Sequence, residues 1–246
     1  MPSVTTLAVL ALIGATVVAG VIRTTLGVGA GIFLTASMSF FFEAKRALAI
    51  MAILQIAFDL SAGYHFRGQW NRRLLVPMVP ATVAGVLLGT WLVAVVPGIW
   101  IRRVMGAALV LYTIVQALRG RRGLGEPPRP GVATGILVAA LSGAASALVN
   151  VSGVILAVYL AALRLPQAAF LGTLTATQLI QDVFKLGAYW RVGLLGAEEV
   201  RVSLPFVPLI FAGGAIGVLL NRYLPAKLFG WMVQGFVFLT GIRLLL

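Results

Sequence analysis

Four polar side chains stand within eight residues of an otherwise apolar stretch, and they are Gln178, Gln181, Asp182 and Lys185. Residues three or four positions apart are neighbours on a helix surface, so this spacing predicts a polar ladder along one helix face. In that ladder Lys185 would offer a positive charge to an anion, and both glutamines would donate amide hydrogen bonds. Asp182 would orient Lys185 or take up a coupling proton. The alternative is a structural ion pair between Asp182 and Lys185 that only fixes helix packing.

The composition identifies a membrane protein. Of the 246 residues, 61% are hydrophobic and only 10% are charged, and the mean hydropathy is +1.05. A soluble domain has about 25% charged residues, so this chain has too few polar groups to cover a water-facing surface. The net charge of +13 comes from short basic clusters between apolar segments. That pattern is typical of contact with anionic lipid headgroups and does not indicate a nucleic-acid partner.

The chain has no Cys and a single His, so the sequence predicts no metal site and no cofactor. It contains no HExxH, GxSxG or P-loop motif, and we therefore do not expect an enzyme.

Breaks at charged residues, Pro and Gly divide the chain into ten apolar segments. These cover about residues 4–22, 30–42, 47–64, 74–96, 103–118, 132–149, 152–163, 167–189, 202–221 and 228–246. The second and seventh are too short to cross a hydrocarbon core of about 30 Å at about 1.5 Å per residue. The expected fold is an all-α polytopic membrane protein with roughly 8 to 10 transmembrane helices and one short broken or re-entrant segment in each half.

The two halves of the chain repeat the same order of features. Pro80, Gly85, Gly89 and Pro97 have the same spacing as Pro208, Gly213, Gly217 and Pro225. Between the halves, residues 119–130 combine charges with helix breakers, which predicts a basic cytoplasmic linker joining a repeat at 1–118 to a repeat at 131–246. The distribution of basic residues favours inverted halves, and parallel halves with eight full spans are the alternative. In both arrangements Arg67, Arg72 and Arg73 lie on the cytoplasmic side.

Each short segment follows a break in the helical pattern. The candidate residues are Gly27, Gly29 and Gly31 at the first break and Asn150, Ser152 and Gly153 at the second. A broken helix exposes unpaired backbone N–H groups and the positive end of a helix dipole, and both favour an anion near the middle of the membrane. Alternatively, these small residues only let helices pack closely.

Gln55 and Asp59 repeat the spacing of Gln178 and Asp182. They would form a second wall of the site, with Asp59 as a proton carrier, or they would make hydrogen bonds between helices. Arg23 ends the first apolar segment. It would guide an anion inward, or it would extend its charged end to the membrane surface.

The order of these motifs resembles the sulfite exporter TauE/SafE family of bacterial permeases, also called the toluene sulfonate uptake permease family. The resemblance spans nearly the whole chain. It rests on the Gly-rich break GVGAGIF, on the exit that ends in Gln69 and Trp70, on the Pro, Gly, Gly, Pro pattern and on the second copy of that order. It implies a multi-pass transporter of sulfite, sulfonates or related organosulfur anions.

Together these features predict a secondary transporter of the cell membrane, inner or plasma. It would move a small anion by alternating access around a site near the midplane, driven by a proton gradient. An uncoupled anion channel or facilitator and a non-transporting membrane scaffold subunit are the alternatives. The sequence leaves the oligomeric state open, a homo-oligomer included.

Overall fold

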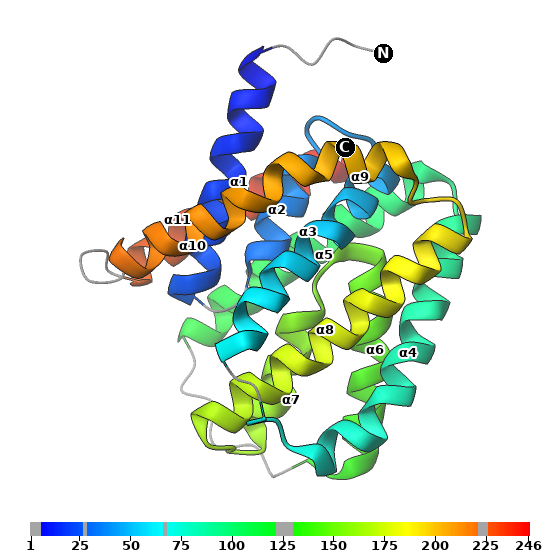
Figure 1. Ribbon diagram of the computed structural model, residues 1–246, viewed down its shortest axis with the longest axis vertical. Coiled ribbons are helices and arrows are strands. Elements are labelled where there is room, and N and C mark those ends of the chain that lie inside the picture. The colour runs from blue at the N-terminus through cyan, green and yellow to red at the C-terminus, as the bar shows by residue number, and fades with distance from the viewer. Residues whose placement is uncertain (1–5, 27–28, 66–67, 122–129, 221–225) are drawn as a thin grey trace.

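A computed structural model of the chain describes residues 6–26, 29–65, 68–121, 130–220 and 226–246, and every regular element within these ranges is a helix. The helices are α1 (Thr6–Leu26), α2 (Ala30–Met38), α3 (Ala44–His65), α4 (Arg72–Val95), α5 (Gly98–Arg121), α6 (Val132–Val149), α7 (Ser152–Ala162), α8 (Gln167–Arg191), α9 (Ala197–Ser203), the 3-10 helix η1 (Leu204–Phe206), α10 (Val207–Leu220) and α11 (Ala226–Leu245). Figure 1 shows this order along the chain. The all-α prediction is confirmed for the described residues.

The ten apolar segments correspond to helices α1 to α8, α10 and α11. The sequence analysis missed α9, because its seven residues carry charges and have no apolar periodicity. Helix α5 continues to Arg121, into the first positions of the predicted linker. The rest of that linker, residues 122–129, lies outside the described residues, as does Arg67.

Both short segments form short helices. At about 1.5 Å per residue, the 9 residues of α2 and the 11 residues of α7 are each far shorter than a hydrocarbon core of about 30 Å. Helix α2 leads into the start of α3, whereas α7 leads into the start of α8, and these two starts lie at opposite ends of the molecule (Figure 1). The short helices therefore run in opposite directions from the middle of the protein.

Four helical stretches of the described chain are long and apolar enough to cross a membrane: Arg72–Val95, Gly98–Val115, Val132–Val149 and Ala197–Gly217. Shorter apolar helices cover Val9–Arg23, Ser152–Ala162 and Gln234–Leu245. Helix α8 has 25 residues, enough length to cross, but it is more polar than these four because it carries the ladder predicted above. The chain is a multi-pass membrane protein.

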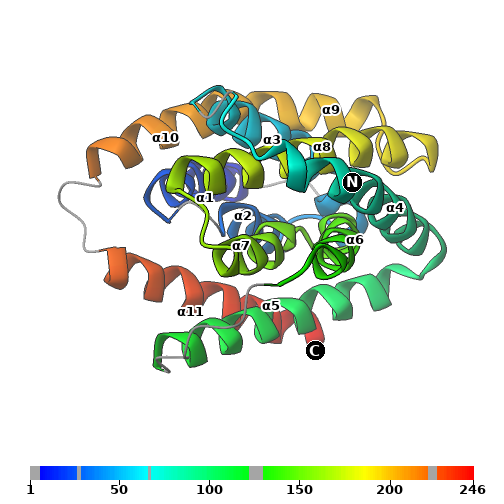
Figure 2. The same ribbon diagram turned by 90° about the horizontal axis from the view of Figure 1, so that it is seen from below.

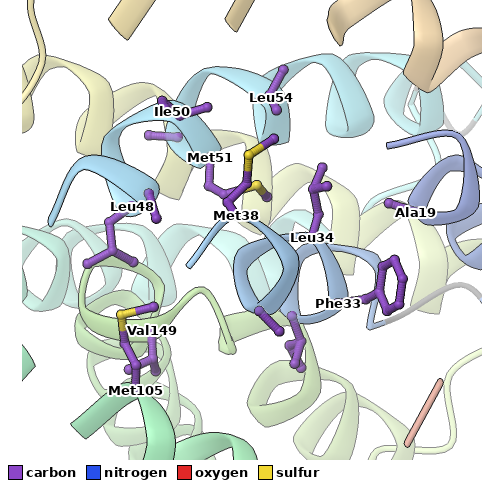
Figure 3. Close-up of a cluster of buried hydrophobic side chains, with 14 of the residues drawn as sticks. Ala19, Phe33, Leu34, Met38, Leu48, Ile50, Met51, Leu54, Met105 and Val149 are labelled. Carbon is purple, nitrogen blue, oxygen red and sulfur yellow. The ribbon is translucent and has the colours of Figure 1, made fainter. Parts of the chain in front are cut away.

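The apolar core surrounds α2. Every residue of this helix except Gly31 is buried, which is the pattern of a helix enclosed on all sides. Along α3, residues 47–52 are completely buried. Figure 3 shows side chains of α2 and α3, such as Leu34, Met38 and Met51, packed together in this core. The start of α2 is thus held inside the protein, where its first backbone N–H groups are not in contact with lipid.

Helices of each half pack against helices of the other half. Helix α1 packs on α10 and α6 packs on α4, so the first helix of each half lies against a helix of the other half. The pairs α3 with α8 and α5 with α11 join equivalent helices of the two halves. Helices α5 and α11 lie side by side along one edge of the molecule (Figure 2). The division into 1–118 and 131–246 stays a prediction about the sequence repeat, since the two parts share one packed structure.

Helices α3 and α8 run antiparallel. Near the start of α3, Arg46 forms an ion pair of 2.5 Å with Glu198, which follows the end of α8. After the end of α3, the backbone N–H of Asn71 donates a 2.9 Å hydrogen bond to Oγ1 of Thr173, near the start of α8. The contacts at both ends therefore give the two central helices opposite directions.

Glycines of the repeated pattern allow α4 to pack closely on α6 and α10 to pack closely on α1. A methyl group added at Gly85 on α4, or at Gly213 on α10, would collide with a backbone carbonyl oxygen of the facing helix. The same holds for their partners in these crossings, Gly143 on α6 and Gly20 on α1. Because backbone atoms cannot rotate away as a side chain can, these crossings require glycine.

We expect Gly85→Ala and Gly213→Ala each to lower the melting temperature of the detergent-purified protein. Overpacking of this kind typically costs about 1–3 kcal/mol. Gly187→Ala on α8 is the matched control, because a methyl group there meets nothing within 4 Å and Ala forms helices better than Gly. Equal losses in all three variants would contradict the proposed helix crossings.

Candidate functional site

Lys185 is fully buried, and its ammonium group is bound by four side chains. It donates hydrogen bonds to Oε1 of Gln55 at 2.6 Å, to Oδ1 of Asn150 at 3.0 Å and to Oγ of Ser146 at 3.2 Å. Oδ1 of Asp182 lies 2.8 Å from the same nitrogen. A buried charge is tolerated only when it is paired and hydrogen-bonded, and this ammonium group meets both conditions.

This arrangement joins three helices from both halves of the chain. Lys185 and Asp182 lie on α8, Ser146 and Asn150 on α6 and its end, and Gln55 on α3. The predicted ladder on α8 therefore exists, and its Asp182–Lys185 ion pair is present at i, i+3 spacing.

Asn150 connects this cluster to α2. It ends α6 in the left-handed conformation, with φ 55° and ψ 35°, a region in which Asn is more easily accommodated than most residues. Its Nδ2 donates a 3.1 Å hydrogen bond to Oγ1 of Thr35, while its Oδ1 accepts from Lys185. The break between α6 and α7 is thus fixed to both Lys185 and α2.

A second ion pair lies beside the first. Arg23 on α1 and Asp59 on α3 are 2.7 Å apart, and the Asp59 side chain is 4% exposed. Asp182 and Lys185 lie close enough to Asp59 to interact with it electrostatically. The centre of the protein therefore holds two basic and two acidic side chains in one connected group.

A small cavity of about 30 Å³ lies between the starts of α2 and α7. Backbone and side chains of the first turns of both helices line it, together with Arg23, Gln55, Asp59, Asn150 and Gln178. A cavity needs roughly 10–15 Å³ to hold one water molecule, so this one has room for about one or two. Its lining is polar because these five side chains face it.

The two breaks are built in the same way around this cavity. A methyl group added at Gly31 would lie 2.8 Å from Nε2 of Gln55, and one at Gly153 would lie 2.7 Å from Nε2 of Gln178. Each glycine therefore makes room for the amide nitrogen of the glutamine from its own half. Since Lys185 binds Oε1 of Gln55, the orientation of that amide is fixed with its N–H groups toward Gly31.

Neither short helix has a side-chain cap at its start. Gly29 precedes α2 with a φ of 97° and Val151 precedes α7, and neither side chain accepts a hydrogen bond from the first turn. The first N–H groups of a helix have no partner within the helix, and the helix dipole places partial positive charge there. The first turns of both helices line the cavity, so this partial positive charge lies next to it.

Two glutamine oxygens are buried without a partner among the described residues, and they are Oε1 of Gln178 and Oε1 of Gln181. Gln181 donates instead to the hydroxyl of Ser142. Buried polar atoms of proteins nearly always have a partner. Gln178 lines the cavity, so its oxygen can accept a hydrogen bond from a donor there, such as water or a protonated oxyanion.

The structure brings most of the predicted site residues to the cavity. Those that line it are Arg23, Gly29, Gly31, Gln55, Asp59, Asn150, Gly153 and Gln178. Those that are buried without lining it are Ser152, Gln181, Asp182 and Lys185. Gly27 lies outside the described residues. The charges next to the cavity are therefore those of the Arg23–Asp59 ion pair, while Lys185 holds Gln55 and Asn150 in place.

Sequence reasoning missed Ser142 and Ser146, and it missed the Arg23–Asp59 pair. The two serines and Asn150 are spaced four apart, so they lie on one face of α6 toward Gln181 and Lys185. That spacing was a usable signal. The pairing of Arg23 with Asp59 joins residues on different helices and has no local signal.

Comparison with known proteins identifies one family. The model of the family described as sulfite exporter TauE/SafE matches residues 12–244. No curated protein and no solved structure gives a significant match.

We expect Lys185→Met to destabilise the protein strongly, because it leaves the buried Asp182 carboxylate without its cation. Breaking a buried pair by removing one partner costs roughly 3–5 kcal/mol. The double variant Lys185→Met, Asp182→Asn removes both charges and is expected to recover part of the loss, as measured by thermal unfolding in detergent. If the double variant is as unstable as the sum of the two single variants, the two side chains do not interact.

Proposed function

The chain belongs to the sulfite exporter TauE/SafE family, and we propose that it is a secondary transporter of a small sulfur-containing anion such as sulfite or a sulfonate. The family is one of membrane transporters and not of enzymes. The observation that carries the proposal is the central polar cavity, in which two uncapped helix starts meet the Arg23 guanidinium group.

The groups around the cavity suit an oxyanion. Arg23 supplies a guanidinium group, whose planar set of donors binds oxyanions well. The first turns of α2 and α7 supply backbone N–H groups, and helix starts of this kind bind anions in many proteins. The amide nitrogens of Gln55 and Gln178 add one donor group from each half. Oxygens of sulfite or a sulfonate would accept from all of these.

Lys185 acts in this proposal as a positioning residue. Its ammonium group fixes the amide of Gln55 so that the donor side faces Gly31, and it holds Asn150 at the second break.

We propose that the anion is moved by alternating access. The cavity of about 30 Å³ is smaller than a sulfur oxyanion needs, so it must widen when the substrate enters. The antiparallel packing of α3 and α8, and the opposite directions of α2 and α7, support inverted halves that open the site to one side at a time. We also propose roughly 8 to 10 spans in a cell membrane, the count that the ten apolar segments of the sequence suggest.

Proton coupling through Asp59 and Asp182 completes the proposal. Asp59 pairs with Arg23 beside the cavity, and Asp182 pairs with Lys185 behind it. An anion that binds Arg23 competes with Asp59 for the same guanidinium group, and protonation of Asp59 would release Arg23 to the anion. Anion and proton would then bind together.

We expect sulfite uptake into proteoliposomes that contain the purified protein, and we expect Arg23→Gln to lower it by at least roughly tenfold, the effect of losing one charge-assisted hydrogen bond. The double variant Arg23→Gln, Asp59→Asn removes both charges of the pair. It is used if the unpaired Asp59 carboxylate prevents the single variant from folding. Arg103→Gln is the control, since Arg103 lies over Trp100 on the exposed side of α5.

Uptake that collapses when a protonophore is added supports coupling, whereas uptake that persists unchanged would identify an uncoupled channel. A well-folded protein that transports no sulfur oxyanion would overturn the proposed function. Uptake that Arg23→Gln leaves at the wild-type rate would overturn the proposed site.

A further inference from the structure

A second and larger hollow lies far from the central cavity, at the end of the molecule where α2 leads into α3. Its volume is about 660 Å³. The turn between α2 and α3, the start of α5 and the end of α11 form its walls. These walls belong to the α5–α11 pair, which runs along one edge of the molecule in Figure 2, and to the core helices α2 and α3.

The walls of this hollow carry three cations and one carboxylate. The cations are Lys45, Arg102 and Arg243, and the carboxylate is that of Glu43. Lys45 donates a 3.3 Å hydrogen bond to the backbone oxygen of Ala94, and Arg102 donates one of 3.1 Å to that of Arg243. Among the described residues, no ion pair joins any of the three cations to a carboxylate, and three cations against one carboxylate leave the hollow with a net positive charge.

The hollow also has an apolar side. Phe40 and Phe41 line it and are exposed, and the guanidinium carbon of Arg243 lies 4.2 Å from the ring centre of Phe40. The basic groups are therefore held by aromatic and backbone contacts next to exposed apolar surface.

Exposed tryptophans place this hollow at the edge of the membrane. Trp91 near the end of α4, Trp100 at the start of α5 and Trp190 near the end of α8 are 56%, 54% and 72% exposed. Tryptophan gathers at the level of lipid headgroups. The start of α5 also forms a wall of the hollow, so the hollow opens at that level.

We propose that this hollow binds the headgroup of an anionic phospholipid. The phosphate would lie among Lys45, Arg102 and Arg243, with the adjacent acyl chains against Phe40 and Phe41. A site of about 660 Å³ fits a phosphate with its glycerol group, whereas a free sulfur oxyanion would fill only a small part of it. This site goes beyond the proposed transport function, and a bound lipid there would join the α5–α11 pair to the core.

Native mass spectrometry of the detergent-purified full chain tests the proposal, with phosphatidylglycerol and phosphatidylcholine of identical acyl chains as probes. We expect preferential retention of phosphatidylglycerol, and a loss of its affinity by roughly tenfold or more in Arg102→Gln, Arg243→Gln. Arg103→Gln is the matched control, because Arg103 is adjacent in sequence but does not line the hollow. Lys45→Gln is the second variant, since Arg102 also links α5 to α11 and its loss can affect folding.

Three results would overturn the proposal. The first is equal retention of the two lipids by the wild-type protein. The second is a loss of phosphatidylglycerol binding in Arg103→Gln as large as in Lys45→Gln or the double variant. The third is displacement of phosphatidylglycerol by excess sulfite, which would assign the hollow to free small oxyanions.

Discussion

The burial of the Lys185 ammonium group is the constraint on which the centre of this protein depends. A charge that is fully removed from water must be surrounded by acceptors, and Asp182, Gln55, Ser146 and Asn150 supply them. Because these acceptors lie on three helices from both halves, one side chain fixes how the halves meet. It also decides which side of the Gln55 amide faces the break before α2. The geometry of the cavity therefore follows from a residue that does not line it.

The two halves contribute equivalent glutamines to the cavity, but their basic residues lie on different helices. Gln55 and Gln178 face Gly31 and Gly153 with the same contact, so the two breaks are built alike. The basic residues differ. Arg23 lies on the first helix of its half, whereas Lys185 lies on the third helix of the other half. The duplicated scaffold thus carries one cation beside the cavity and one behind it, which allows a repeated fold to bind one anion with distinct roles for the two charges.

The sequence allowed the scaffold to be predicted well, because apolar length and helix breakers are local signals. The ten segments, the two short helices and the polar ladder on α8 were all found in this way. Helix α9 was missed because it is charged and short, and its contact with Arg46 is distant in sequence. The roles of Arg23 and Lys185 could not be separated from sequence either, since both are basic residues near apolar segments. Only their helix neighbours distinguish the cation at the cavity from the cation that holds its walls.

An experimental structure of the protein with selenite, an electron-rich analogue of sulfite, tests the account most directly. Anomalous diffraction locates selenium without reference to any assumed site. If the anion binds in the central cavity, a single strong peak is expected between Gly31 and Gly153, within hydrogen-bonding distance of the Arg23 guanidinium group, with Lys185 still bound to Gln55. A peak in direct contact with Lys185 after its bonds to Gln55 and Asn150 have broken, or a peak only among Lys45, Arg102 and Arg243, would contradict it.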